Sequence, residues 1–316
     1  MTLRLPDRWI WDFWTVDEGA RIHVFYLQAP RSLGDPDLRH WNVTIGHATS
    51  PDLRRWEIQP DALAPGAPGT FDDRSTWTGS IIRADGAWAM LYTGTSSAED
   101  GLVQRVGLAT SDDLTTWTRH PGPVLEADPR WYELLDRDAW HDQAWRDPWL
   151  FRVDGDDAVH AYVTARARDG DPRGRGVVGH ARSRDLVTWE VLPPVTAPMG
   201  FGQMEVPQLV AAGDRWHLLF SSDPGTRTDA LGLRGSGTYG LSGPTPFGPF
   251  DPATLTELDA GADHVTYAGR VVPHGGGMSF LAWVGYRDGV TFAGELAEPR
   301  PVVAGADGTL TIGAAR

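Results

Sequence analysis

One pattern of eleven residues, Gly-x-Ala-x-Ser-x-Asp-Leu-x-x-Trp, occurs three times in this chain of 316 residues. The copies span residues 46–56, 107–117 and 179–189. Each copy predicts a short strand, then a turn in which the Ser and Asp side chains bond local backbone, then a tryptophan that packs the next strand. Internal repetition of this kind restricts the chain to architectures that are built from successive similar units.

An alternating or apolar strand precedes each copy, and two further strands of the same kind follow without a copy. These five segments are residues 21–28, 88–95, 159–165, 216–222 and 279–286. Each of them is preceded by one more strand, and the starts of those preceding strands lie 58 to 68 residues apart. Five four-stranded units of this size fill the chain, which predicts an all-β fold, a five-bladed β-propeller with residues 1–316 in a single domain.

Three segments depart from the strand pattern. Residues 129–140 are predicted to be the one helical stretch, inserted before the inner strand of the third unit. Residues 64–69 and 169–176 are rich in Gly and Pro or in Arg and Gly, and both are predicted to be loops over the central funnel. The second of these loops is interpreted as a solvated surface loop or a mobile lid.

Three isolated carboxylates lie at the starts of three predicted inner strands. They are Asp12 among aromatic residues, Asp147 between Arg146 and Pro148, and Glu205 between Met204 and Val206. Because the first strand of each blade lines the channel of a propeller, these carboxylates should converge. The apolar neighbours of Glu205 suit a proton donor, and Arg146 should keep Asp147 ionised. Two carboxyl groups can serve an oxocarbenium-like transition state, which leaves the third to bind ring hydroxyls.

Composition narrows the class of partner. Acidic residues outnumber basic ones by 42 to 28, the net charge is −14, and no lysine is present, so binding to nucleic acid is not expected. A neutral small-molecule saccharide is the expected partner, and 15 tryptophans could supply flat faces for sugar rings. No cysteine, metal motif or cofactor fingerprint occurs, so neither a metal nor a cofactor is expected. The sequence shows no signal peptide and no membrane-spanning run, which predicts a cytoplasmic protein that does not insert into membranes.

The ordered set of motifs resembles glycoside hydrolase family 32 and its relative family 68. Trp11-Asp12 resembles the nucleophile motif, and Arg146-Asp147-Pro148 and Glu205-x-Pro207 resemble the other two acidic motifs. Further matching segments are residues 23–26, 46–56, 71–80 and 294–310. The resemblance implies a five-bladed propeller that cleaves or transfers β-fructofuranosyl groups with retention of configuration.

Residue by residue, the resemblance implies Asp12 as the nucleophile and Glu205 as the general acid and then base. It implies that Asp147 binds two fructosyl hydroxyls and stabilises the transition state. The residues that it implies for shaping the fructosyl subsite are Trp11, Trp77, Ser80 and Arg146. The chain departs from the family 32 pattern at Leu27 and Val206, and no β-sandwich is expected after Arg316.

The leading hypothesis is a retaining glycosidase that releases β-fructofuranosyl residues from sucrose or short fructo-oligosaccharides through a fructosyl-enzyme intermediate. Retention predicts a separation of about 5–5.5 Å between the carboxyl groups of Asp12 and Glu205. The alternatives are an inverting enzyme like those of family 43, an arabinofuranosidase or xylosidase, and a propeller that binds sugars without catalysis. The choice between hydrolysis and fructosyl transfer, the exact substrate and the oligomeric state stay open at this stage.

Overall fold

Five antiparallel sheets make up the structure, a computed structural model that describes residues 2–261, 265–287, 289–305 and 308–314. The first three blades are β1 (Arg8–Asp17), β2 (Ile22–Pro30), β3 (Thr44–Ser50) and β4 (Glu57–Leu63); β5 (Ser75–Ala84), β6 (Ala87–Thr95), β7 (Gln104–Ser111) and β8 (Thr118–Arg119); and β9 (Trp145–Arg152), β10 (Val159–Arg166), β11 (Gly176–Ser183) and β12 (Glu190–Leu192). The last two are β13 (Glu205–Ala212), β14 (Arg215–Ser222), β15 (Ser236–Gly243) and β16 (Thr256–Gly261); and β17 (Thr266–His274), β18 (Gly277–Tyr286), β20 (Arg300–Ala304) and β21 (Leu310–Ile312), with β19 (Phe292–Leu296) also paired to β18.

The helices of the described residues are short 3-10 turns between strands. They are η1 (Arg31–Leu33), η2 (Pro36–Trp41), η3 (Ser97–Glu99), η4 (Pro224–Thr226), η5 (Asp229–Leu231) and η6 (Pro252–Thr254). In the described part of the chain, no helix is long and apolar enough to cross a membrane.

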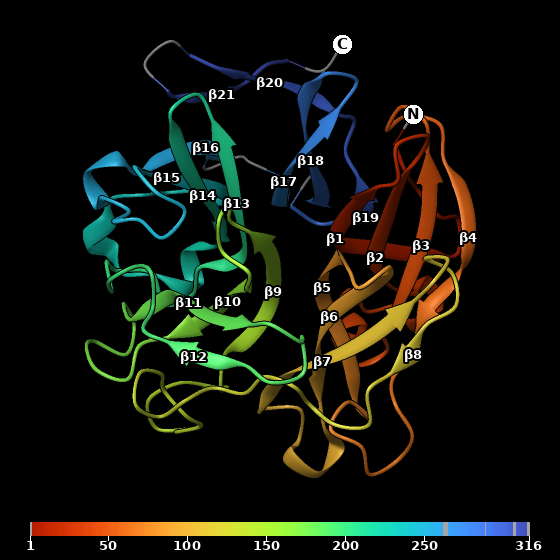
Figure 1. The fold of residues 1–316 in the computed structure, drawn as a ribbon, viewed down its shortest axis with the longest axis horizontal. Coiled ribbons are helices and arrows are strands. Elements are labelled where there is room, and N and C mark those ends of the chain that lie inside the picture. The colour runs from red at the N-terminus through yellow and green to blue at the C-terminus, as the bar shows by residue number, and fades with distance from the viewer. Residues whose placement is uncertain (1, 262–264, 288, 306–307, 315–316) are drawn as a thin grey trace.

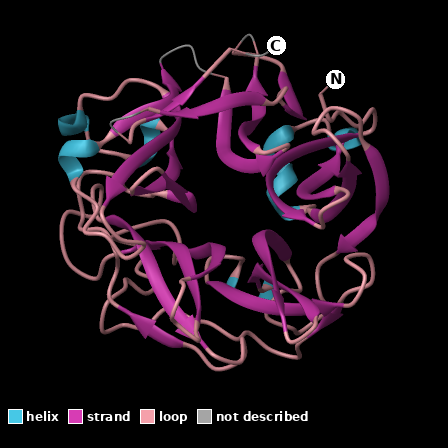
Figure 2. Ribbon diagram, turned by 45° about the horizontal axis from the view of Figure 1, so that its top comes forward, coloured by secondary structure: helices cyan, strands magenta, loops and turns pink. Residues whose placement is uncertain are grey.

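The sheets are arranged around a common axis with the first strand of each sheet innermost (Figures 1 and 2). The inner strands β1, β5, β9, β13 and β17 contact one another in this order, and β17 contacts β1 again. The ring is also joined outside these strands, because the Leu296 amide donates to the Leu3 carbonyl at 3.0 Å and Arg31 Nη2 donates to the Ala293 carbonyl at 2.7 Å. The predicted five-bladed β-propeller is confirmed, and each of the five predicted second strands coincides with an observed one.

The repeated sequence forms the turn between the third and fourth strands of the first three blades. In each copy the Asp Oδ1 accepts two backbone amide hydrogen bonds of 2.7 to 2.9 Å, at Asp52, Asp113 and Asp185. The following leucine takes a left-handed backbone with φ between 57° and 64°, and its side chain is buried. Such a conformation costs about 1–3 kcal/mol, and burial of a leucine side chain returns about 1.5–3 kcal/mol. The repeat therefore encodes a strained turn that packing stabilises.

Residues 129–140 form turns instead of the predicted helix, so that prediction is wrong. The carbonyls of Asp128 and Asp136 each close a separate turn by accepting two later amides. Between these turns the Tyr132 ring is 1% exposed and packs 4.7 Å from the Trp145 ring. The next residue donates its amide to the Arg166 carbonyl. Contacts with the neighbouring blade thus outweigh the weak local preference for helix.

Candidate active site

A β-bulge interrupts the inner strand of every blade at the same level. In β1 and β5 one residue, Asp12 or Thr78, has no partner on the second strand. In the other three blades, two residues of the inner strand lie opposite a single residue of the second strand. The first of the two has positive φ in each case: Asp147 (56°), Val206 (52°) and Ala268 (49°). Bulges redirect side chains that strict alternation would send to opposite faces. Consecutive residues of these strands can therefore face the same cavity.

The bulges create two levels of side chains around a cavity of about 660 Å³. The residue before each bulge lines this cavity in all five blades: Trp11, Trp77, Arg146, Glu205 and Tyr267. At the bulge itself, Asp12, Thr78 and Asp147 line the cavity, whereas Val206 and Ala268 are buried outside it. The three carboxylates that the sequence singled out thus share one site, although they come from three blades.

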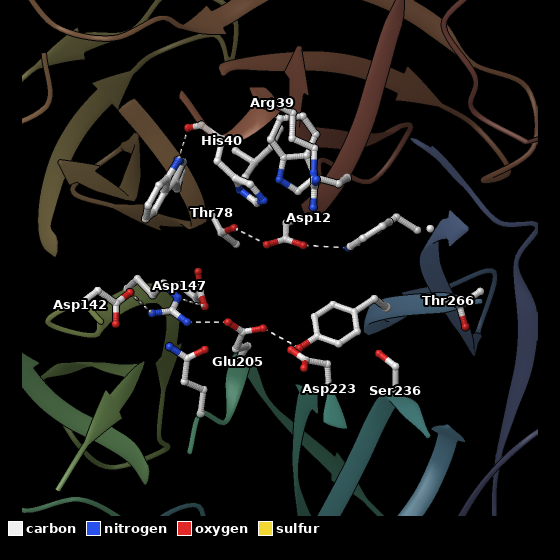
Figure 3. A pocket seen from close by; sticks show the side chains of 18 of the residues that line it. Asp12, Arg39, His40, Thr78, Asp142, Asp147, Glu205, Asp223, Ser236 and Thr266 are labelled. Carbon is white, nitrogen blue, oxygen red and sulfur yellow. Dashed lines mark hydrogen bonds and ion pairs between the residues drawn. The ribbon is translucent and has the colours of Figure 1, made fainter. Parts of the chain in front are cut away.

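Asp12 is buried, and both of its carboxylate oxygens accept hydrogen bonds (Figure 3). Trp283 Nε1 donates to Oδ1 at 2.8 Å, and Thr78 Oγ1 donates to Oδ2 at 2.9 Å. Burial first, and then the charges of Asp147 and Glu205, raise the pKa of Asp12 to about 6 against the two hydrogen bonds, which lower it. Asp12 is thereby fixed in orientation, and it ionises only near neutral pH.

Glu205 lies between a cation and a phenol. Arg146 Nη2 donates to its Oε1 at 2.5 Å, and the Tyr267 hydroxyl donates to its Oε2 at 2.5 Å (Figure 3). Burial, followed by the charge of Glu205, raises the pKa of Tyr267 well above its usual value of 10, so Tyr267 remains a donor. The residue directly before the bulge in three adjacent blades is Arg146, Glu205 or Tyr267. The shared position of the bulges therefore brings these three hydrogen-bonded side chains into one row.

Asp147 is less closely paired with Arg146 than its place in the sequence predicts. Its Oδ2 accepts from Thr164 Oγ1 at 2.8 Å and from the Val206 amide at 3.1 Å, while Arg146 Nε lies 3.5 Å away. Burial raises the pKa of Asp147, and this outweighs the opposing charge of Arg146. The charge of Arg146 acts in the direction that the sequence predicted, toward the ionised form of Asp147, although the shortest contact of its guanidinium is with Glu205.

Ser80 is the one predicted site residue that does not line the cavity. Its hydroxyl accepts the Leu150 amide at 2.9 Å and so joins β5 to β9. Gly79 before it is needed for close packing, because a Cβ there would lie 2.2 Å from the Leu91 carbonyl oxygen. Trp77 does line the cavity, and its Nε1 donates to the His40 carbonyl at 2.9 Å.

Several residues of the wall carried no recognisable sequence signal. The segment η2 brings Arg39, His40 and Trp41 to the cavity, next to Leu27, the position of one departure from family 32. Burial, and then the charges of Arg39 and Arg146, lower the pKa of His40 to about 3, so this ring is neutral. The residues of this segment did not indicate a site, because tertiary contacts set its position. One such contact joins Trp41 to Trp77, whose ring centroids lie 5.6 Å apart.

The cavity is rich in acidic groups. Among its described lining residues, five are acidic and two are arginines: Asp12, Asp142, Asp147, Glu205 and Asp223 against Arg39 and Arg146. The buried Arg270 lies outside the lining, donates to the Pro207 carbonyl at 2.7 Å and adds positive charge near Asp147 and Asp12. No group of three or more His, Asp or Glu side chains in the described ranges is arranged to hold a metal ion.

The two predicted funnel loops, residues 64–69 and 169–176, do not line this cavity. Arg175, in the second loop, bonds to Glu133 at 2.5 Å, and the Gly176 amide donates to the Phe201 carbonyl at 2.7 Å. These bonds hold the end of the loop against neighbouring segments. Residues 169–173 are exposed, as the sequence predicted for a surface loop.

Comparison with known proteins gives one family for most of the chain. Residues 16–293 match the profile described as "Glycosyl hydrolases family 32 N-terminal domain". The chain is 29% identical over 283 residues to the sucrose-6-phosphate hydrolase of Klebsiella pneumoniae, covering 85% of this chain and 54% of that protein. It is 28% identical over 211 residues to the raffinose invertase of Escherichia coli, covering 64% of this chain and 39% of that protein. The chain spans about half the length, or less, of the curated relatives that it matches.

Solved structures share the fold. The inulosucrase of Halalkalicoccus jeotgali bound to kestose superimposes with a TM-score of 0.81 at 23% identity, covering 98% of this chain and 87% of that chain. A family 32 β-fructofuranosidase of Bombyx mori superimposes with a TM-score of 0.73 at 21% identity, covering 98% of this chain and 64% of that chain.

Proposed function

The chain belongs to glycosyl hydrolase family 32, and we propose that it is a retaining glycoside hydrolase that releases terminal β-fructofuranosyl residues from sucrose or short fructo-oligosaccharides. The observation that carries this proposal is the meeting of Asp12 and Glu205 in one cavity, with Asp147 beside them. The curated relatives cited above bear names of enzymes that act on sucrose-6-phosphate or raffinose, which supports the same substrate class.

In the first step a carboxylate oxygen of Asp12 attacks the anomeric carbon of the fructosyl group. The bond from that carbon to the leaving oxygen breaks, and Glu205 gives its proton to this oxygen. In the second step Glu205 takes a proton from water, whose oxygen displaces Asp12 from the anomeric carbon. A sugar hydroxyl in place of water gives fructosyl transfer by the same exchange of bonds.

This sequence of steps requires opposite protonation states of Asp12 and Glu205. Asp12 must be ionised to attack, and its pKa of about 6 makes that the main form at neutral pH. Glu205 must carry the proton, although Arg146 and Tyr267 donate to both of its oxygens in the free protein. The glycosidic oxygen would replace one of these donors and become the acceptor of the proton from Glu205.

Asp147 is placed to hold the sugar. Thr164 and the Val206 amide both donate to Oδ2, and no hydrogen bond of the described residues is made to Oδ1. A carboxylate oxygen can accept hydroxyl donors, and such bonds strengthen as positive charge develops on the ring. Trp11 and Trp77, at the level above, present aromatic surface to the same space.

The test is to incubate the purified protein with sucrose, inulin-type and levan-type oligosaccharides and aryl arabinofuranosides, and to identify the released sugar. We expect fructose, released first in its β configuration by NMR, and no fructose from Asp12→Asn. Asp52→Asn, in a blade turn, is the matched control and should keep its activity. Release of arabinose alone, or equal activity of Asp12→Asn and the wild type, would refute the proposal.

A further inference from the structure

A second cavity, of about 310 Å³, lies among the outer strands of the fourth blade, where β21 approaches β16 (Figure 1). It shares no lining residue with the cavity that holds Asp12. His217 lines it, is 6% exposed, and has no hydrogen-bond partner for Nε2 among the described residues. Buried polar groups are normally hydrogen-bonded, so this nitrogen points to a ligand.

Equivalent histidines in two other blades have partners for both ring nitrogens. His23, His160 and His217 are equivalent because each pairs with the inner-strand residue four positions after the bulge, which is residue 16, 151 or 210. His23 Nδ1 is bonded to His47 Nε2 at 2.9 Å, and His23 Nε2 to Glu18 Oε2 at 3.1 Å. The first blade thus places a carboxylate at the nitrogen that lacks a partner in His217.

The third blade repeats this arrangement. His160 Nδ1 is bonded to His180 Nε2 at 3.0 Å, and His160 Nε2 to Asp156 Oδ2 at 3.1 Å. In the second blade two apolar residues, Ala89 and Leu108, take the places of the two histidines. In these three blades the two histidines are therefore present together or replaced together.

The fourth blade keeps the first histidine and lacks the second. Gly240 stands where His47 and His180 stand in their blades, two residues before the residue that pairs with the first histidine. A Cβ at Gly240 would lie 2.8 Å from Leu258 Cδ1, so this leucine fills part of the space. The cavity is the part that remains beside the His217 ring.

The lining of the cavity favours an anion with an apolar body. Among its described lining residues the ionisable ones are Arg215 and His217, and Arg215 forms no ion pair within the described ranges. Burial lowers the pKa of His217, against a smaller effect of the Gly308 backbone, so the neutral ring can donate from Nε2. The apolar part of the wall consists mainly of leucines: Leu241, Leu255, Leu258 and Leu310.

We propose that this cavity binds a small carboxylate with an apolar body. The carboxylate accepts a hydrogen bond from His217 Nε2 and pairs with Arg215, while the apolar body lies against the leucines. The ligand thereby supplies the group that Glu18 and Asp156 supply in their own blades. The site does not rest on the proposed function, and binding stabilises the folded protein where β21 closes the fourth blade.

The test is calorimetric titration and thermal unfolding of the whole protein with benzoate and hexanoate, an aromatic and an aliphatic carboxylate. Acetate lacks the apolar body and benzyl alcohol lacks the charge, so these two are the matched probes at constant ionic strength. We expect a Kd of about 1 mM for at least one of the two carboxylates. At ten times this concentration Tm should rise by about 2 °C, and by less than about 1 °C with acetate or benzyl alcohol.

Two variants locate the binding. His217→Phe removes the donor at nearly constant volume and should weaken binding at least about tenfold. Arg215→Gln should weaken it roughly two- to fivefold, because this side chain is exposed. Arg21→Gln, at the corresponding place two residues before His23, is the matched control and should bind as the wild type does. Circular dichroism shows whether each variant is folded, and Arg215→Gln carries the test if His217→Phe is not.

Three results decide the outcome. The absence of saturable binding of both carboxylates, or unchanged binding in both His217→Phe and Arg215→Gln, would overturn the site. An equal rise in Tm with acetate or benzyl alcohol would also overturn it, because the ligand would then need only one of its two parts. A protein that bound benzoate and cleaved no fructoside would overturn the proposed function and leave this site standing.

Discussion

Replacement of Asp12 by asparagine is expected to make the protein more stable at neutral pH while it abolishes turnover. Folding raises the pKa of Asp12 from its usual 3.8 to about 6, because the carboxyl group is buried beside Asp147 and Glu205. The protonated form therefore contributes stability below about pH 4, and this contribution is lost as pH rises through about 6. At pH 7.5 the ionised Asp12 costs about 3 kcal/mol of folding free energy, and at pH 4 it costs about 0.5 kcal/mol.

Asparagine removes this cost and can retain both contacts. Its oxygen accepts from Trp283, and its NH₂ group can donate to the Thr78 hydroxyl. The entropy of unfolding scales with chain length, so for 316 residues 1 kcal/mol corresponds to roughly 1.5 °C in Tm. We expect Asp12→Asn to melt about 4–5 °C above the wild type at pH 7.5 and less than about 1 °C above it at pH 4.

The assay is thermal unfolding of the wild type and Asp12→Asn across pH 4 to 7.5, with urea midpoints as a second measure. Asp52→Asn is a control of opposite sign. Burial raises the pKa of Asp52, but the amide hydrogen bonds from Arg55 and Arg54 together with the Arg55 side chain outweigh it and lower the pKa to about 2. That variant should lose stability at pH 7.5. A difference between Asp12→Asn and the wild type that stays constant with pH, or that favours the wild type at pH 7.5, would refute the electrostatic account of this site.

Three further outcomes follow from the same geometry. The acidic limb of kcat/KM for sucrose should have an apparent pKa of about 6, because Asp12 must ionise; constant activity down to pH 4 would contradict this. Thr78→Val removes a bond that lowers the pKa of Asp12, so it should move this limb to higher pH and reduce kcat/KM about tenfold, as pH profiles of the two proteins would show. Sucrose-6-phosphate should be a poorer substrate than sucrose, because five acidic groups and only two arginines line the described cavity. The difference in kcat/KM should be about tenfold or more at low salt and smaller at 0.5 M NaCl. A preference for the phosphorylated sugar would argue against this charge balance.

The fold could be predicted from sequence because its information is local and repeated. The turns at Asp52, Asp113 and Asp185 mark the ends of equivalent strands, and five strand pairs at regular spacing leave few architectures. Asp12, Asp147 and Glu205 were predictable as one site for the same reason, since each lies in the inner strand of its blade. Their convergence could be inferred once five blades were predicted, because the inner strands of all blades line one channel.

The bulges explain most of what the sequence could not predict. In an unbroken strand Arg146 and Asp147 would face opposite ways, so no alternation pattern reveals that both line one cavity. Ser80 was expected at the site, whereas the bulge at Thr78 leaves the Ser80 hydroxyl as an acceptor for β9. Arg39 and His40 reach the cavity from a connecting segment whose course depends on packing against distant residues.

The recurrence of one bulge in five blades makes the wall of this cavity a set of interchangeable positions. All five inner strands have this bulge, but the residue at the bulge differs from blade to blade: Asp12, Thr78, Asp147, Val206 and Ala268. Chemistry at this level can therefore be exchanged one side chain at a time while the hydrogen-bonded ladder above and below stays intact. Val206 and Ala268 are the two bulge positions whose side chains are apolar and buried outside the cavity, so a new functional group there would also have to be accommodated by the surrounding core.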